Sequence, residues 1–71
     1  MESTYKVIEL VGTSPESWEQ AAAVALAEAR KSLRDLRIAQ VEELDIHLDE
    51  AGEIVAFRTK LKVSFKYAGT D

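Results

Sequence analysis

Two carboxylates stand two residues apart in the second half of the chain, at Glu43 and Asp45. If this stretch is a strand, both side chains share one face and their Cα atoms lie about 6.6–6.8 Å apart. Calcium is bound by six to eight oxygen atoms, mostly from carboxylates, carbonyls and water. The spacing therefore predicts Glu43 and Asp45 as ligands of a cation site that neighbouring subunits or water complete. The alternative is that both acids are solvated or paired with Lys60 and Lys62.

Other residue types that bind metals are sparse. The chain has no cysteine and a single histidine, His47, which excludes thiolate sites and zinc sites built on several imidazoles. His47 shares the expected face of Glu43 and Asp45, but a lone histidine there is more often exposed or hydrogen-bonded than a ligand. No loop has the spacing of an EF-hand. Further carboxylates lie at the ends of the expected elements: Asp35, Asp49, Glu50 and Glu53.

The residues needed for enzyme chemistry are missing from the sequence. There is no cysteine nucleophile, no serine with a plausible histidine and acid partner, no glycine-rich phosphate loop and no HExxH motif. Glu42 and Glu43 are adjacent, so on a regular strand they point to opposite faces and cannot act together. The sequence predicts a protein that is not an enzyme.

The length of the chain favours self-association. Its 71 residues contain no internal repeat and no linker rich in Pro, Gly or Ser, which predicts a single domain spanning residues 1–71. A chain this short buries only about 60% of its unfolded surface. Because the lack of cysteine excludes disulfides, contacts with partner subunits are the strongest remaining source of stability.

The charge balance bears on partners and location. Thirteen acidic and nine basic residues give a net charge of −4. This argues against a nucleic-acid partner, because phosphate binding needs a basic surface. The N-terminal residues lack the layout of a signal peptide, and no apolar run reaches the length of a membrane span. We expect a soluble, cytoplasmic protein with no membrane partner.

The first half of the chain predicts a strand followed by a long helix. Residues 5–12 are β-rich and end at a glycine. Ser14 can cap a helix, and Pro15 suits its first position. A helix from there to about residue 36 is about 33 Å long at 1.5 Å per residue. One apolar stripe follows it at steps of three and four: Trp18, Ala22, Ala25, Ala29, Leu33 and Leu36.

The second half predicts a β-hairpin. Between residues 38 and 48 the apolar period changes to two, with Leu44, Ile46 and Leu48 on one face. Residues 49–53 supply the turn. The last strand alternates more cleanly. One face carries Phe57, Thr59, Leu61, Val63, Phe65 and Tyr67, and the other carries Arg58, Lys60, Lys62, Ser64 and Lys66.

The element order βαββ predicts an α+β fold. The hairpin makes strands two and three antiparallel, and the helix returns the chain to the end where strand one began. Strand order 1-3-2 then makes every neighbouring pair antiparallel. One helix covers only one face of this sheet, so the charged face is left to water or to another subunit. On that face, Glu43, Asp45 and His47 are expected to neighbour the basic row, giving opposite-charge cross-strand pairs.

Over nearly its whole length the chain resembles the dodecin family. The resemblance is carried by "YKVIELVGTSPESWEQAA" at the start, "EARKSLRDL" before the second strand and "LKVSFK" in the last strand. It is most similar to the calcium dodecin subgroup, whose members share a "GTSPxSWEQAA" run and a "VSFK" ending. The resemblance implies a sheet that partly wraps one long helix, and twelve copies that close into a hollow shell of four trimers.

The resemblance also implies a ligand site with two changed residues. Flavin dodecins store flavins between subunits, each stacked on a tryptophan at the start of strand two and hydrogen-bonded by a glutamine in strand three. Ile38 occupies the place of the tryptophan, and Arg58 that of the glutamine. Ring stacking is worth roughly 1–3 kcal/mol, which Ile38 cannot supply. Arg58 can still stack its guanidinium or bind a phosphate. Trp18 lies on the helix stripe, where a packing role is expected.

Three functions follow as expectations. The first is a dodecin-like binding and storage protein, a homododecamer that has lost ordinary flavin stacking and binds calcium, another cation or some other small ligand. The second is a flavin reservoir with altered contacts. The third is a structural or protein-interaction module that docks through the basic face of the last strand.

Overall fold

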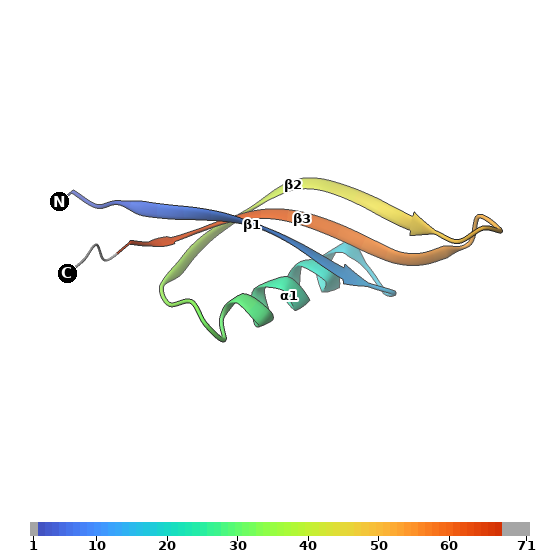
Figure 1. The fold of residues 1–71 in the computed structure, drawn as a ribbon, viewed down its shortest axis with the longest axis horizontal. Coiled ribbons are helices and arrows are strands. Elements are labelled where there is room, and N and C mark those ends of the chain that lie inside the picture. Colours follow the sequence, from blue (N-terminus) through green and yellow to red (C-terminus); the bar gives the residue numbers. More distant parts are fainter. Residues whose placement is uncertain (1, 68–71) are drawn as a thin grey trace.

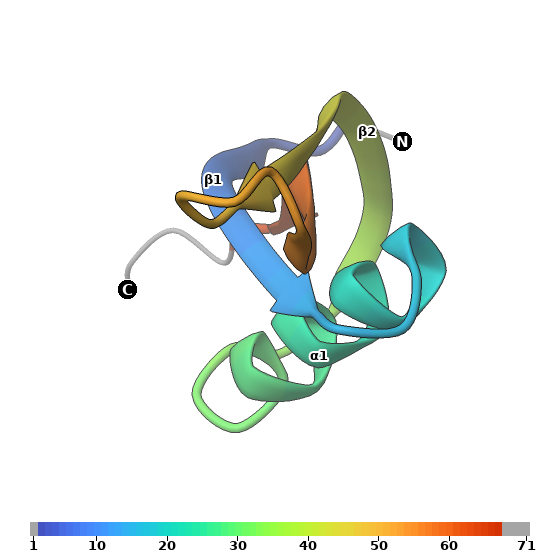
Figure 2. The same cartoon turned by 90° about the vertical axis from the view of Figure 1, so that its right-hand side faces the viewer.

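The computed structural model describes residues 2–67 and confirms the order of elements predicted from the sequence. The three strands form one sheet of order β1-β3-β2, and both neighbouring pairs are antiparallel. A single helix lies against one side of the sheet (Figures 1 and 2). The elements are β1 (Tyr5–Ser14), α1 (Trp18–Ala29), β2 (Leu36–Leu48) and β3 (Ile54–Lys66).

The helix is shorter at both ends than the sequence pattern predicted. Ser17, not Ser14, is its N-cap, and the Ser17 side chain accepts a hydrogen bond from the backbone N–H of Gln20. Ser14 instead ends β1, where it pairs with Phe57. At the other end α1 stops at Ala29, and the next residues form turns. The predicted helix start at Ser14 was wrong because an equally good cap lies three residues later and strand pairing occupies the first one.

The connection after α1 ends in a residue with left-handed backbone geometry. Asp35 has φ 59°, a conformation that aspartate tolerates better than most residues. Its carbonyl accepts a hydrogen bond from the backbone N–H of Lys66 at 3.2 Å, which joins the connection to β3. Leu33 and Leu36, predicted on the helix stripe, therefore lie in the connection and at the start of β2.

The core lies where α1 crosses β1 and β3. Leu61 and Val63 on β3 are 1% exposed, and Ala25 of α1 packs against them. The small alanine side chains on the inner side of α1 let the helix approach the sheet closely. At Gly12 of β1 the helix backbone lies so near that no Cβ fits between them. The other apolar residues packed on this core are Ile8, Leu10, Ala22, Leu26 and Leu36.

The strand β3 alternates as predicted. The side chains buried against α1 are those of Thr59, Leu61 and Val63. The alternate residues Arg58 and Lys60 lie on the opposite side of the sheet and form ion pairs. We call these the helix face and the outer face of the sheet. The alternation is therefore confirmed for this strand.

The strand β2 departs from simple alternation at a β-bulge. Val41 pairs with Leu61 and Glu43 with Lys60, so Glu42 is an extra residue without a partner in the register. Because Val41 and Leu44 both face the helix side, Glu42 and Glu43 both lie toward the outer face. The prediction that these two carboxylates point to opposite faces was wrong.

The β2–β3 hairpin extends well beyond the N-terminal end of α1 (Figure 1). The molecule measures 53 × 20 × 16 Å, and the helix packs on β1 and β3, not along β2. Large apolar side chains on the helix face of β2 are consequently exposed. They are Val41, Leu44, Ile46 and Leu48, and we call them the bare stripe of β2. Within residues 2–67, no helix has the length and apolar character needed to cross a membrane.

Candidate functional site

Among the described residues, the shortest ion pair joins Asp45 of β2 to Arg58 of β3 on the outer face. The two residues are direct partners in the strand register. Arg58 Nε donates to Oδ1 of Asp45 at 2.7 Å, and Nη2 donates to Oδ2 at 2.9 Å. Both carboxylate oxygens are therefore used by one planar guanidinium, the geometry that arginine pairs best. The predicted opposite-charge pairing across these strands is confirmed here.

The ion pair changes the acidity of both groups. The hydrogen bond from Arg58 holds the pKa of the Asp45 carboxyl below its ordinary value, and the same bond raises the pKa of the Arg58 guanidinium. Each side chain remains 47% exposed, so solvent screens the interaction. The pair fixes side-chain geometry more than it stabilises the fold.

The lowered pKa predicts an acid-dependent contribution to stability. In the unfolded chain Asp45 titrates near its ordinary value, about 3.9, and in the folded chain it titrates lower. The contribution of Asp45 to the free energy of unfolding is therefore present above about pH 4, and it is lost as the pH falls through the lower pKa of the folded state. We expect Asp45→Asn to be less stable than the wild type at pH 7, with a difference that shrinks below pH 4.

Urea unfolding of both proteins between pH 2 and pH 7 measures this difference. Glu50→Gln removes the same charge from an exposed position in the hairpin turn and serves as the matched control. If the difference in the free energy of unfolding between the wild type and Asp45→Asn stays constant down to pH 2, the prediction is contradicted.

Trp18 ties the start of α1 to this part of the sheet. Its indole Nε1 donates to the backbone carbonyl of Asp45 at 3.0 Å. The ring packs edge-on against Phe57, with centroids 5.1 Å apart and planes at 71°. The Trp18 carbonyl accepts a hydrogen bond from the hydroxyl of Thr59 at 2.8 Å. The predicted packing role of Trp18 is confirmed, and one residue fixes the helix to both β2 and β3.

Glu43 lies in the same outer row as Asp45, two residues away. Its register partner is Lys60, but the Lys60 ammonium lies 3.8 Å from the carboxylate of Glu9 on β1. The neighbouring Lys62 pairs with Glu42 at 3.9 Å. In the part of the chain that the structure describes, no group of three or more acidic or histidine side chains is placed to hold a metal ion. A cation at Glu43 and Asp45 needs further ligands from outside this chain.

The two positions equivalent to the flavin site lie far apart in one chain. Ile38 is 66% exposed near the start of β2 and pairs with Ser64. Arg58 lies six residues from Ser64 along β3, roughly 20 Å at the rise of a strand. The structure does not bring Ile38 and Arg58 together, so any ligand that touches both must lie between subunits.

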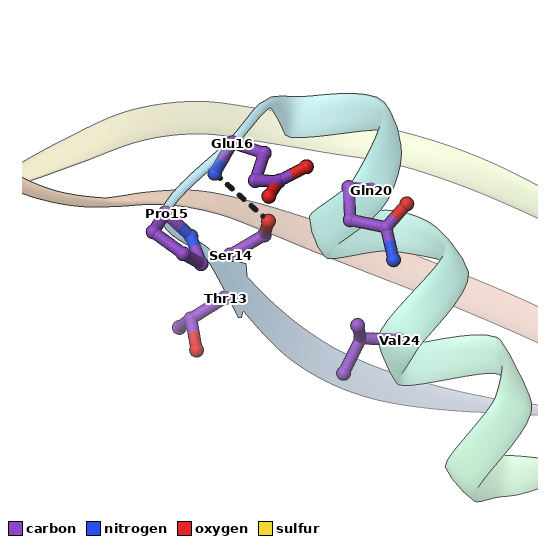
Figure 3. Close-up of a pocket in the computed structure, with 6 residues that line it drawn as sticks. All are labelled: Thr13, Ser14, Pro15, Glu16, Gln20 and Val24. Carbon is purple, nitrogen blue, oxygen red and sulfur yellow. Dashed lines mark hydrogen bonds between the residues drawn. The ribbon is translucent and has the colours of Figure 1, made fainter.

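Two shallow pockets flank the N-terminal half of α1. One, of about 290 Å³, lies between the helix and the bare stripe of β2, with Trp18 and Leu44 in its lining. The other, of about 320 Å³, lies at the junction of β1 and α1 (Figure 3). There the Ser14 hydroxyl is already bonded to the backbone N–H of Glu16 at 3.0 Å. Neither lining includes a site residue predicted from the sequence.

Comparison with known proteins agrees with this fold. The family model for dodecin matches residues 4–68. The chain belongs to the dodecin family. Calcium dodecin of Mycobacterium tuberculosis is 58% identical over 64 residues, covering 90% of this chain and 89% of that protein. The dodecin of Thermus thermophilus is 43% identical over 70 residues, covering 99% and 100%.

Solved dodecin structures share the architecture. The crystal structure of the M. tuberculosis protein, described as a calcium-chelating antigen with a novel calcium-binding site, has a TM-score of 0.84 at 54% identity and covers 97% of each chain. Dodecin from Streptomyces davaonensis has a TM-score of 0.88 at 32% identity, covering 97% of this chain and all of that one. Dodecin backbones thus stay alike while the side chains diverge.

Glu42 is the outer-face carboxylate that the sequence pattern missed. The bulge places it on the outer face, where its carboxylate pairs with Lys62 at 3.9 Å. A signal was present in the sequence: Val41 and Leu44 are apolar residues three apart inside a strand that otherwise repeats every two. Such a phase change indicates an inserted residue.

Proposed function

We propose that this dodecin chain is a binding and storage protein, not an enzyme, that takes up calcium or a similar divalent cation within a hollow homododecamer of four trimers. The observation that carries the proposal is its 58% identity to calcium dodecin of M. tuberculosis. The absence of an aromatic side chain at Ile38 supports a ligand other than a stacked flavin. We place the protein in the cytoplasm as part of the same proposal.

The exposed apolar surface supports the assembly. The side chains of the bare stripe of β2 are still 39–53% exposed, because α1 packs mainly on β1 and β3. Ile38 and Val7 add exposed apolar side chains on the outer face. A closed, symmetric assembly removes such surfaces from water and completes sites that one chain leaves unfinished. This matches the cation site, where two carboxylates are too few.

We propose Glu43 and Asp45 as calcium ligands contributed by each chain. Either Glu43→Gln or Asp45→Asn is expected to weaken calcium binding by roughly tenfold or more, because a neutral amide loses the ligand charge. Calorimetric titration of the assembled protein measures the change. Glu53→Gln, an exposed acid in the hairpin turn, is the matched control.

The outcomes of this titration separate two errors. Unchanged calcium binding in both Glu43→Gln and Asp45→Asn contradicts the choice of ligands. A wild-type protein that shows no binding of calcium contradicts the cation proposal itself.

Flavin binding is the second candidate, favoured by the 66% exposure of Ile38 at the equivalent position. The absent ring predicts little quenching of riboflavin or flavin mononucleotide fluorescence at micromolar protein. Ile38→Trp restores an aromatic face and is expected to tighten binding by about tenfold or more. Micromolar quenching by the wild type would support the flavin function over the cation function.

Docking of a protein partner on the basic row is the third candidate. In the described structure, Arg58, Lys60 and Lys62 each lie beside a carboxylate of their own chain. This internal neutralisation weakens the row as an attractive surface for acidic partners.

A further inference from the structure

The side of α1 that faces away from the sheet is apolar. Residues 21–27 are all apolar, so the helix has no polar face in this stretch. Its inward alanines are buried against the sheet, whereas Ala23, Val24 and Ala27 are exposed. Ala23 and Ala27 are one turn apart and Val24 lies beside them, so the three form one surface, which we call the outward face of α1. A helix that is apolar all round is typical of a buried element.

The bare stripe of β2 is a second apolar surface of similar length. From Val41 to Leu48 the strand rises about 23 Å at 3.3 Å per residue. The 12 residues of α1 rise about 18 Å at 1.5 Å per residue. Small side chains of a helix pack closely on branched side chains of a strand, as Ala25 already does with Leu61 and Val63 in the core. The outward face of α1 and the bare stripe can pack in the same way.

One chain cannot bring these two surfaces into contact. The buried alanines hold α1 against the sheet, so its outward face points away from the strands (Figure 2). The hairpin that carries the bare stripe runs past the N-terminal end of the same helix (Figure 1). Each surface therefore needs a cover from another molecule, because exposed apolar patches of this kind mark interaction sites.

The charges beside the two surfaces are complementary. The segment after α1, residues 30–37, carries four basic residues and one acidic residue, and we call it the basic segment. The turn of the hairpin carries three acidic residues and no basic residue, and we call it the acidic turn. Within residues 2–67, no ion pair in the chain involves Arg30, Arg34, Glu50 or Glu53. A bare stripe that runs along the outward face of α1 in the helix direction brings the acidic turn to the basic segment.

We propose that the hairpin of one copy lies along the outward face of α1 in a second copy, with the bare stripe against Val24 and the acidic turn beside the basic segment. The inference rests on the proposed function, and it names one contact that holds the copies of that assembly together. Each helix is then covered by its own sheet on one side and by a neighbour's hairpin on the other. Because two different surfaces meet, the contact is head-to-tail and can close into a ring.

The acidic turn is ordered before it meets a partner. The Asp49 carboxylate accepts hydrogen bonds from the backbone N–H groups of Ala51 and Glu53, both at 2.9 Å. Gly52 supplies the left-handed residue of the turn, with φ 82°. A segment that is already ordered loses little conformational entropy when it binds.

Val24→Lys tests the apolar part of the contact. Val24 is 45% exposed in its own chain, so a lysine there is solvated until a second copy covers it. Burying that unpaired charge is costly. We expect the protomer concentration at which half of the assembly dissociates, measured by light scattering over a dilution series, to rise at least tenfold. Val11→Lys makes the same change on the outer face, away from both surfaces, and should stay within about twofold of the wild type.

A charge swap tests the polar part of the contact. One variant reverses the basic segment with Arg30→Glu and Arg34→Glu. A second variant reverses the acidic turn with Glu50→Lys and Glu53→Lys. Each is expected to raise the dissociation concentration by roughly tenfold, because like charges then face each other across the contact. Neutralising one acid, as in Glu50→Gln, should change it little, since a single exposed pair contributes little.

Combining all four reversals in one chain decides between attraction and general damage. Opposite charges then meet again, so the dissociation concentration should return to within about threefold of the wild type. A combined variant that assembles no better than either pair of reversals overturns the proposal. If the combined variant does not fold, equal dissociation of Val24→Lys and Val11→Lys overturns it. A wild type that stays monomeric overturns the proposed assembly as well, whereas an assembled wild type that none of these changes weakens overturns only this contact.

Discussion

Gly12→Ala is expected to lower the free energy of unfolding by about 3 kcal/mol or to prevent folding. An added Cβ at this position would lie 1.9 Å from the carbonyl oxygen of Ala21 and 3.0 Å from the Cβ of Ala25. The first contact is with helix backbone, which cannot rotate aside as a flexible side chain can. The helix has to move away from β1, and forcing extra volume into a packed contact costs about 1–3 kcal/mol and occasionally more.

Gly52 provides a matched control for the Gly12 variant. It has φ 82°, and an added Cβ would meet nothing within 4 Å. Gly52→Ala therefore carries only the backbone strain of the left-handed region, about 1–2 kcal/mol. Chemical denaturation at one fixed protomer concentration measures both variants, since assembly makes stability depend on concentration. A Gly12→Ala protein no less stable than Gly52→Ala would contradict the close helix–strand contact.

Trp18→Ala is expected to cost about 3 kcal/mol, and Trp18→Phe about 1 kcal/mol. The alanine variant removes the ring that packs on Phe57 together with the indole donor to the Asp45 carbonyl. The phenylalanine variant keeps one aromatic ring and removes the donor together with the smaller volume of the second indole ring. Trp18 is only partly buried, so the expected loss lies at the lower end of the about 3–5 kcal/mol for truncating a large core aromatic, and one hydrogen bond contributes about 1 kcal/mol.

The difference between the two Trp18 variants separates packing from hydrogen bonding. Denaturation midpoints at equal protomer concentration give both values. Equal losses for Trp18→Ala and Trp18→Phe would show that the indole donor, not the ring, supplies the stability. A loss below about 0.5 kcal/mol in both would show that Trp18 does not hold α1 to the hairpin.

Strand periodicity predicted the fold better than the cap residues predicted the helix. The alternation of burial in β3 holds from Arg58 to Ser64, so this part of one face could be assigned residue by residue. The helix start was placed too early because Ser14 and Ser17 both precede suitable first turns, and only strand pairing decides between them. The helix end was placed too late because apolar spacing continued into a connection that forms turns.

The candidate site was only partly predictable for a related reason. Glu43 and Asp45 share the outer face as their spacing indicated. Which basic residue faces Asp45 depends on the hairpin register, and register is set by the turn and by bulges that alternation alone does not fix. The sequence therefore predicted a charged row opposite these acids without identifying Arg58 as the bidentate partner. The outer-face position of Glu42 was missed for the same reason, because it depends on a bulge in β2.

The bare stripe of β2 links the fold to the function. If neighbouring subunits cover it, assembly removes these apolar side chains from water. The proposed cation ligands lie on the opposite, outer face, so their missing partners have to come from a second contact of the same assembly. If no subunit covers it, the chain exposes Val41, Leu44, Ile46 and Leu48 to water.

Light scattering coupled to size-exclusion chromatography tests this dependence on neighbours most directly. At micromolar protomer concentration and below, the mass is expected near twelve times the 7.9 kDa of one chain. A particle of 7.9 kDa that retains its β-sheet circular dichroism and its cooperative unfolding at the same dilution would contradict the assembly.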